Sequence, residues 1–154
     1  MKLNYKSGFT IFEFLIAISI MALLVAIVFS GFINLRKHQA LKLDTETIAG
    51  ILREARSETL ASKNGTRYGV HFSATKVTLF AGSVYNPSDP NNKDFMLNAS
   101  DAVFNITLAG GGSDVIFNRL TGETSQNGVI TLSSPSTAQI KTVTVYKTGV
   151  VESN

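Results

Sequence analysis

An apolar segment near the N-terminus constrains this chain more than any other feature. From Phe9 to Ile33 the sequence reads FTIFEFLIAISIMALLVAIVFSGFI, and Glu13 is the only ionisable side chain in it. About 20 apolar residues in a helix are enough to cross the hydrocarbon of a bilayer. Basic residues precede and follow the segment, so the charge rule does not fix its orientation. The segment predicts one membrane-spanning helix.

Two ordinary interpretations of this segment leave something unexplained. A secretory signal peptide has a basic start and an apolar centre, but this apolar run is longer, contains a carboxylate and lacks a small-x-small cleavage site. A plain single-pass anchor accounts for the length and not for Glu13, because a charged group in hydrocarbon normally has a partner and a function. Glu13 lies close to one end of the segment, where it can partly reach the interface, so the plain anchor stays open.

A third interpretation uses the whole string from Lys6 to Ala17, KSGFTIFEFLIA. It resembles the prepilin processing motif of type IV pilins and pseudopilins. The resemblance implies that a membrane peptidase cuts after Gly8 on the cytoplasmic side and that the new N-terminus, Phe9, is N-methylated. It also implies that Glu13, fifth in the mature chain, meets the Phe9 amine of an adjacent subunit during assembly.

The pairing has a physical rationale of its own. Cleavage creates an α-amine at Phe9, and methylation leaves that amine basic. An amine and a carboxylate attract each other strongly in a low dielectric, but each is costly to bury alone. Phe9 and Glu13 stand four residues apart, so they are also neighbours on one face of a helix. Either pairing neutralises the carboxylate, and a wrong axial register between subunits would leave a charge unpaired.

The rest of the chain predicts an amphipathic helix and then a β domain. An apolar stripe at helical spacing comes first: Leu41, Ile48, Leu52 and Ala55. Most charged residues, Asp44 among them, are expected off this stripe, and Asn64-Gly65 is a stop signal. We therefore expect residues 1–8 to be a leader, 9–33 a membrane or filament-core half of the helix, 34–64 its amphipathic half, and 65–154 a C-terminal β domain.

Beyond Gly65 the pattern has period two, which predicts strands. We expect strands at residues 67–72, 76–80, 102–108, 115–118, 128–133 and 142–147, with a surface loop at 86–93. The fold class is α+β: a long N-terminal α-helix, membrane-spanning in its first half, packed on a small antiparallel β-sheet domain. Three stretches make the chain most similar to the H-type minor pseudopilins of type II secretion and related minor pilins: Leu52–Thr59, Val115–Asn118 and Gly128–Leu132. The residue at the twenty-second mature position, Ser30, replaces the proline of many major pilins, which also favours a minor subunit.

Catalytic and metal-binding motifs are weak in this sequence. The chain has no cysteine, which excludes disulfides and zinc-thiolate sites. His38 and His71 stand in different segments, and we expect His71 to be an exposed strand residue. Asp89 and Asp94 share a polar loop that could hold calcium, although solvated turn residues are the favoured interpretation. No cofactor, metal site or enzymatic activity is predicted.

The net charge of the chain bears on whether it binds nucleic acid. The net charge is +3, and removing Lys2 and Lys6 with the leader leaves 14 − 2 = 12 basic residues against 11 acidic ones. The processed chain would then have a net charge near +1, and a charge this small does not predict nucleic-acid binding. Four basic residues are candidate phosphate contacts: Arg53, Arg56, Arg67 and Lys76. The alternative is that they are ordinary solvated charges.

The resemblance implies a structural subunit of a filament. It would be processed by the prepilin peptidase and methyltransferase and assembled with other pilin or pseudopilin subunits into a type II secretion pseudopilus or type IV pilus, at initiation or at the tip. The further expected partners are the inner-membrane assembly platform and membrane lipid. The expected location is the bacterial inner membrane, crossed once, with the C-terminal domain extracytoplasmic, and then the filament. The alternative is a DNA-binding minor pilin of a DNA-uptake pilus.

Overall fold

The computed structural model describes residues 10–98, 101–134 and 138–154, and for residues 30–38 and 104 it describes the backbone alone. The chain divides into two compact units, residues 1–36 and residues 37–154. The predicted cleavage site, between Gly8 and Phe9, lies outside the described residues.

One α-helix, α1 (Ile11–Leu60), contributes to both units. Thr10 caps its start, because the Thr10 Oγ1 atom accepts the backbone N–H of Glu13 at 3.2 Å and so satisfies one of the free donors of the first turn. After the helix ends, Ser62 and Asn64 adopt left-handed backbone conformations, with φ of 49° and 53° around the short 3-10 turn η1 (Lys63–Gly65). The predicted long helix is confirmed, and it ends at Leu60, four residues before the predicted stop signal at Asn64-Gly65.

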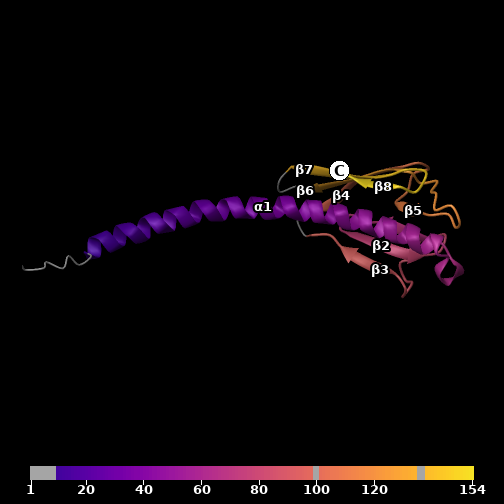
Figure 1. Cartoon of the computed structure of the whole chain (residues 1–154), viewed down its shortest axis with the longest axis horizontal. Helices are drawn as coiled ribbons and strands as arrows, with labels where there is room; N and C mark the ends of the chain where they lie inside the picture. Colours follow the sequence, from indigo (N-terminus) through magenta and orange to yellow (C-terminus); the bar gives the residue numbers. More distant parts are fainter. Residues whose placement is uncertain (1–9, 99–100, 135–137) are drawn as a thin grey trace, which may run out of the picture. The chain divides into compact units, whose positions relative to one another are not determined.

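In the described residues, eight strands form two antiparallel four-stranded sheets, whose strands are drawn as arrows in Figure 1. The first sheet has the order β3-β2-β1-β5 and contains β1 (Tyr68–Phe72), β2 (Lys76–Ala81), β3 (Lys93–Met96) and β5 (Asp114–Ile116). The second has the order β4-β6-β7-β8 and contains β4 (Ala102–Leu108), β6 (Gly128–Ser134), β7 (Gln139–Val145) and β8 (Val151–Ser153). The α+β fold class is therefore confirmed, with two sheets in the β domain.

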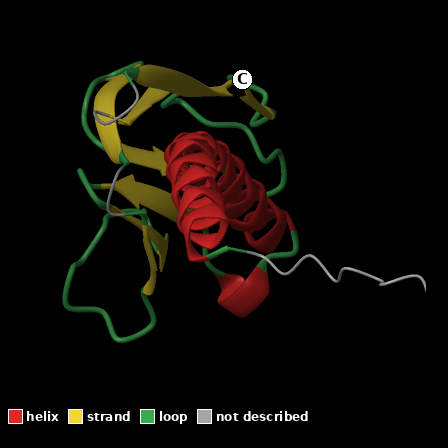
Figure 2. Ribbon diagram, turned by 90° about the vertical axis from the view of Figure 1, so that its left-hand side faces the viewer, coloured by secondary structure: helices red, strands yellow, loops and turns green. Residues whose placement is uncertain are grey.

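Within residues 37–154 the helix and both sheets share one core. The predicted helical stripe is fully buried: Leu41, Ile48, Leu52 and Ala55. These side chains pack in one cluster with Val70 and Val77 of the first sheet and Ile130 and Val143 of the second, and Figure 2 shows strands of both sheets beside the helix. Fully burying such a side chain stabilises a fold by about 1.5–3 kcal/mol, so the stripe holds the two sheets on one scaffold.

Six of the eight strands match predicted segments, with shifts at their ends. The largest shift is in β7 (Gln139–Val145), which begins three residues before the predicted 142–147 strand. Two strands were not predicted, β3 and β8. Both are short edge strands that pair on one side only, and such strands carry little hydrophobic alternation for a sequence pattern to show.

Candidate functional site

The first part of α1 is a continuous apolar surface. Residues Ile11–Phe29 make the one helical stretch in the described part of the chain that is long and apolar enough to cross a membrane, and none of it is buried within the protein. Its large side chains are exposed all round, for example Phe12 at 72%, Met21 at 67% and Phe29 at 67%. Such a surface is stable only against hydrocarbon or against other apolar protein surfaces.

Glu13 stands in the first turn of this helix and is exposed. Its backbone N–H is held by Thr10 Oγ1, which fixes the turn that carries the carboxylate. A negative charge in the first turn is favoured by the helix dipole. The Thr10 cap was not predicted, although the spacing T-x-x-E from Thr10 to Glu13 is the sequence signature of a capping box. The roles of Gly8, Phe9 and Glu13 in processing and assembly stay predictions.

Two of the four basic candidates bind the chain's own backbone. Arg53 donates from Nη2 to the carbonyl oxygen of Val151 at 3.0 Å. Arg56 donates from Nε to the carbonyl oxygen of Gly122 at 3.1 Å and from Nη2 to that of Thr148 at 3.2 Å. Arg53 and Arg56 thus lie on the same helix, where Arg53 ties strand β8 to it and Arg56 ties two turns to it.

The other two basic candidates are placed differently. Lys76 begins β2 and forms an ion pair with Asp94 Oδ2 at 2.9 Å; its hydrogen bond to Asp94 raises the pKa of Lys76 above its ordinary value. Asp94 also accepts a hydrogen bond from Thr78 Oγ1 at 2.6 Å, and these bonds, that of Thr78 first, lower the pKa of Asp94. Arg67 is exposed just before β1.

The histidine and aspartate candidates do not form a metal site in the described residues, where no cluster of three or more His, Asp or Glu could hold an ion. Asp89 accepts hydrogen bonds from the backbone and side-chain nitrogens of Asn91, within its own turn. The expectation of an exposed His71 is wrong: its Nδ1 lies 2.6 Å from Asp114 Oδ1 on β5, with 23% of the side chain exposed. Its ring also stacks on Tyr85 at 4.0 Å. Both partners come from distant segments, which a local pattern does not show.

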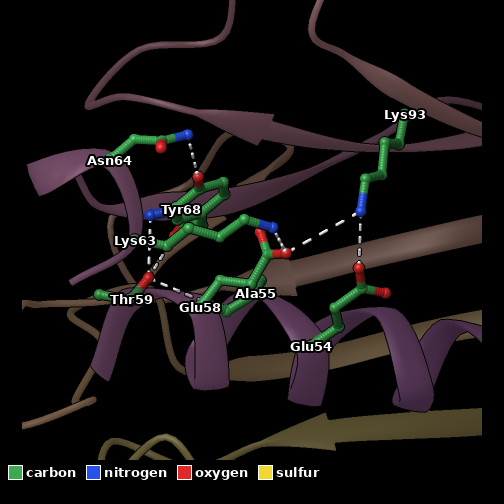
Figure 3. Close-up of polar contacts among 8 residues, drawn as sticks. All are labelled: Glu54, Ala55, Glu58, Thr59, Lys63, Asn64, Tyr68 and Lys93. Carbon is green, nitrogen blue, oxygen red and sulfur yellow. Dashed lines mark hydrogen bonds and ion pairs between the residues drawn. The ribbon is translucent and has the colours of Figure 1, made fainter. Parts of the chain in front are cut away.

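A charged cluster joins the end of α1 to the first sheet (Figure 3). Lys93 lies 2.9 Å from Glu54 Oε1 and 3.9 Å from Glu58 Oε1, and Lys63 also pairs with Glu58. The hydrogen bond to Glu54 raises the pKa of Lys93. Two lysines and two glutamates neutralise one another here, so the cluster fastens a helix to a strand and presents no net charge to a ligand.

Asp44 was expected off the buried stripe of the helix, and that expectation is wrong, because only 7% of it is exposed. Its two carboxylate oxygens accept the backbone N–H and the Nδ2 of Asn98, each at 2.7 Å. Burial is the main cause that raises the pKa of Asp44, and the nearby Asp101 carboxyl adds to it. The aspartate is therefore a tether between α1 and the segment that follows β3.

Comparison with known families decides the class of the protein. The family model of the type II transport protein GspH matches residues 44–149. The chain belongs to the GspH family. The model of the prokaryotic N-terminal methylation motif matches residues 3–29, a range that contains Gly8, Phe9 and Glu13. Neither the search of curated proteins nor that of solved structures found a match.

The two family matches agree with the structure of this GspH-family chain. The methylation motif covers the exposed apolar stretch of α1, and the GspH match covers strands β1 to β7 with most of the helix half that packs against them. Proteins of this family are structural subunits and not enzymes. The match and the apolar helix together indicate a pseudopilin or minor pilin that one helix anchors in a membrane.

Proposed function

We propose that this GspH-family chain is a minor pseudopilin or minor pilin that the prepilin peptidase cuts between Gly8 and Phe9, that is methylated at Phe9, and that enters a type II secretion pseudopilus or type IV pilus at initiation or at the tip. One observation carries the proposal. The methylation-motif match spans residues 3–29 and contains the apolar stretch Ile11–Phe29 of α1, none of which is buried, with Glu13 in the first turn of the helix.

The chemistry of assembly follows from that placement. A lone carboxylate at the head of an apolar helix is costly to move into hydrocarbon or a filament core. The methylated amine of Phe9 on an adjacent subunit supplies the opposite charge, and the exposed apolar side chains supply the packing surface. The proposal therefore includes the peptidase, the inner-membrane assembly platform and other pilin-like subunits as partners, with the β domain on the extracytoplasmic side.

The processing step is tested by mass spectrometry of the chain taken from its native membrane. We expect an N-terminal peptide that begins at Phe9 and carries one added methyl group. A chain that still begins with residues 1–8 would refute the processing step.

The assembly step is tested with Glu13→Ala. We expect the variant to reach the membrane fraction as the wild type does but to be depleted from sheared filaments, because its partner amine loses its counter-charge. Ser19→Ala is a matched control on the same helix, since the Ser19 hydroxyl already donates to the Leu15 carbonyl at 2.8 Å. Equal recovery of Glu13→Ala and Ser19→Ala in filaments would remove the pairing role.

A nucleic-acid role draws little support from Arg53 and Arg56. Their guanidinium groups already donate to backbone carbonyls, so fewer of their donors remain for phosphates. We therefore propose the structural role alone.

A further inference from the structure

Leu120 is the most exposed large apolar side chain in the described residues, at 86%. It also has a left-handed backbone, with φ of 71°, a conformation that is unfavourable for a bulky residue. It sits in a tight turn, closed by Gly122 N–H to Asn118 O at 2.9 Å and by Asn118 N–H to Glu123 O at 2.8 Å. Glycine or asparagine would suit this backbone conformation better, so the leucine side chain contributes little to the stability of the folded domain.

Two further exposed apolar side chains lie beside this turn. Leu60, at the end of α1, is 41% exposed, and Val150, in the turn before β8, is 51% exposed. Both line a cavity of about 360 Å³ with Arg53, Arg56 and Ser57. Leu60 also touches the base of the Leu120 turn, because a Cβ placed on Gly122 would lie 3.1 Å from Leu60 Cδ1. We call Leu60, Leu120 and Val150 the apolar patch.

Two arginine side chains hold in place the turns that carry Leu120 and Val150. Arg56 binds the carbonyl oxygens of Gly122 and Thr148, which belong to the turns of Leu120 and Val150. A second tie comes from Arg53 to Val151. The patch is therefore preorganised, and preorganisation lowers the entropy lost on binding.

The rim of the patch is positive. Arg53 and Arg56 line the cavity, and the chain segments that carry Leu120 and Val150 add two exposed cations, Arg119 and Lys147, and two exposed acids, Glu123 and Glu152. In the described part of the chain none of the four cations lies in an ion pair, whereas Glu152 already accepts the Tyr146 hydroxyl at 2.8 Å. Such a rim favours a partner that carries carboxylates.

We infer that the apolar patch is the docking surface for an acidic segment of a neighbouring, different pilin-like subunit. The inference rests on the proposed function, because it names a contact within the filament. An apolar side chain of the partner packs between Leu60, Leu120 and Val150, and its flanking carboxylates face the basic rim. A protruding aliphatic side chain beside a preformed cavity favours a protein partner, since such side chains form the desolvated centre of protein interfaces.

Substitution of Leu120 by asparagine separates folding from docking. Asparagine tolerates the left-handed backbone, so the melting temperature of the full chain in detergent is expected to be equal to or above that of the wild type. Recovery in sheared filaments is expected to fall roughly tenfold, as for an interface hot spot. Val84→Asn is the matched control, because Val84 is an apolar loop residue with 78% exposure. If Leu120→Asn enters filaments as well as Val84→Asn does, the docking surface is refuted.

The partner is identified by placing the photo-reactive residue p-benzoylphenylalanine at position 120, and in the control at position 84, of the full chain in cells that assemble the filament. The inference is supported if mass spectrometry of the position-120 product shows another subunit with a prepilin-type N-terminus, joined through an acidic peptide. It is overturned by DNA as the product, by a second copy of this chain, by no product, or by the same product from both positions.

The outcomes separate this inference from the function on which it rests. A chain that is cut after Gly8 and requires Glu13 for assembly, but gives no subunit product from position 120, refutes the docking surface alone. A chain that never enters filaments refutes the proposed function and the docking surface with it.

Discussion

Arg56 donates a hydrogen bond from Nε to the carbonyl oxygen of Gly122 at 3.1 Å across 66 residues of sequence. The same side chain reaches the Thr148 carbonyl, so two turns that are distant in sequence meet on one helical residue. Gly149 stands at the point of closest approach, since a Cβ placed there would overlap the Gly122 carbonyl oxygen and lie 2.7 Å from Arg56 Nε. The two turns can approach this closely only because Gly149 has no side chain.

We expect Gly149→Ala to destabilise the domain by roughly 2–4 kcal/mol, through overlap with Gly122 and through its backbone φ of +77°. Gly111→Ala is the control, because Gly111 has a similar φ of +74° with nothing within 4 Å of a placed Cβ; it should lose only about 1 kcal/mol from backbone strain. Urea unfolding of the fragment 37–154 measures both. Equal losses would mean that the close approach of the two turns does not matter.

Replacing Arg56 by methionine removes two hydrogen bonds to carbonyls, whereas Arg53→Met removes one. A hydrogen bond that involves a charged group contributes about 1.5–3 kcal/mol, and the partial exposure of both arginines reduces this. We expect Arg56→Met to lower the unfolding free energy by about 1 kcal/mol more than Arg53→Met does. The reverse order in urea unfolding would contradict the role of Arg56 as the tie between the two turns.

Thr59 and Thr45 offer a matched pair inside the core. Both are buried helical threonines whose hydroxyls donate to the carbonyl four residues earlier. Thr59 alone also accepts the backbone N–H of Tyr68, at 2.8 Å. Thr59→Val should therefore cost about 1–3 kcal/mol, because it leaves a buried N–H without its acceptor, and Thr45→Val should cost less than about 1 kcal/mol. Similar losses in thermal unfolding of the two variants would exclude this explanation.

The pKa shifts of Asp44 and Asp94 have opposite signs and predict opposite pH dependence. Burial raises the pKa of Asp44 above its ordinary 3.8, so the folded state binds the proton more tightly than the unfolded state. Its contribution to stability is greatest below about pH 4 and is lost as pH rises through the folded pKa. Asp44→Asn keeps an oxygen for Asn98 and removes the titration, so its stability relative to the wild type should increase as the pH rises from about 4 through the folded pKa of Asp44.

Asp94→Asn is the control for that experiment. The hydrogen bonds from Thr78 and Lys76 lower the pKa of Asp94, so its contribution is present above about pH 4 and is lost as pH falls through the folded pKa. The stability of Asp94→Asn relative to the wild type should therefore decrease from low pH up to about pH 4 and then level off. Curves of the same sign for the two variants, measured by urea unfolding, would show that the Asp44 shift has been assigned the wrong direction.

The sequence predicted those parts of the fold that depend on local periodicity. Leu41 and Ile48 repeat at helical spacing, and both are fully buried. Asp44 shows the limit of such a pattern, because its burial depends on Asn98, 54 residues away, which offers two hydrogen bonds. Strand β8 was missed for the same reason: three residues show no period, and their pairing partner, β7, is known only from the fold.

The candidate site also contains residues that a local sequence pattern shows and residues that only the fold brings together. The processing motif is contiguous, so Gly8, Phe9 and Glu13 are readable from a dozen residues, and the family match covers that range. The apolar patch is assembled from residues 60, 120 and 150, and no local pattern joins them. The sequence predicts either a solvated charge or a phosphate contact for Arg56. Its two carbonyl partners lie 66 and 92 residues away, so no local pattern shows them.

None of the residues from Ile11 to Phe29 is buried inside the protein. The free energy of this stretch is therefore not a property of the chain alone: it changes with the lipid, the detergent or the neighbouring molecules that cover it. A melting temperature measured for the whole chain will depend on the choice of detergent. The fragment 37–154 has its own core, and its stability should be the same in every mild, non-ionic detergent.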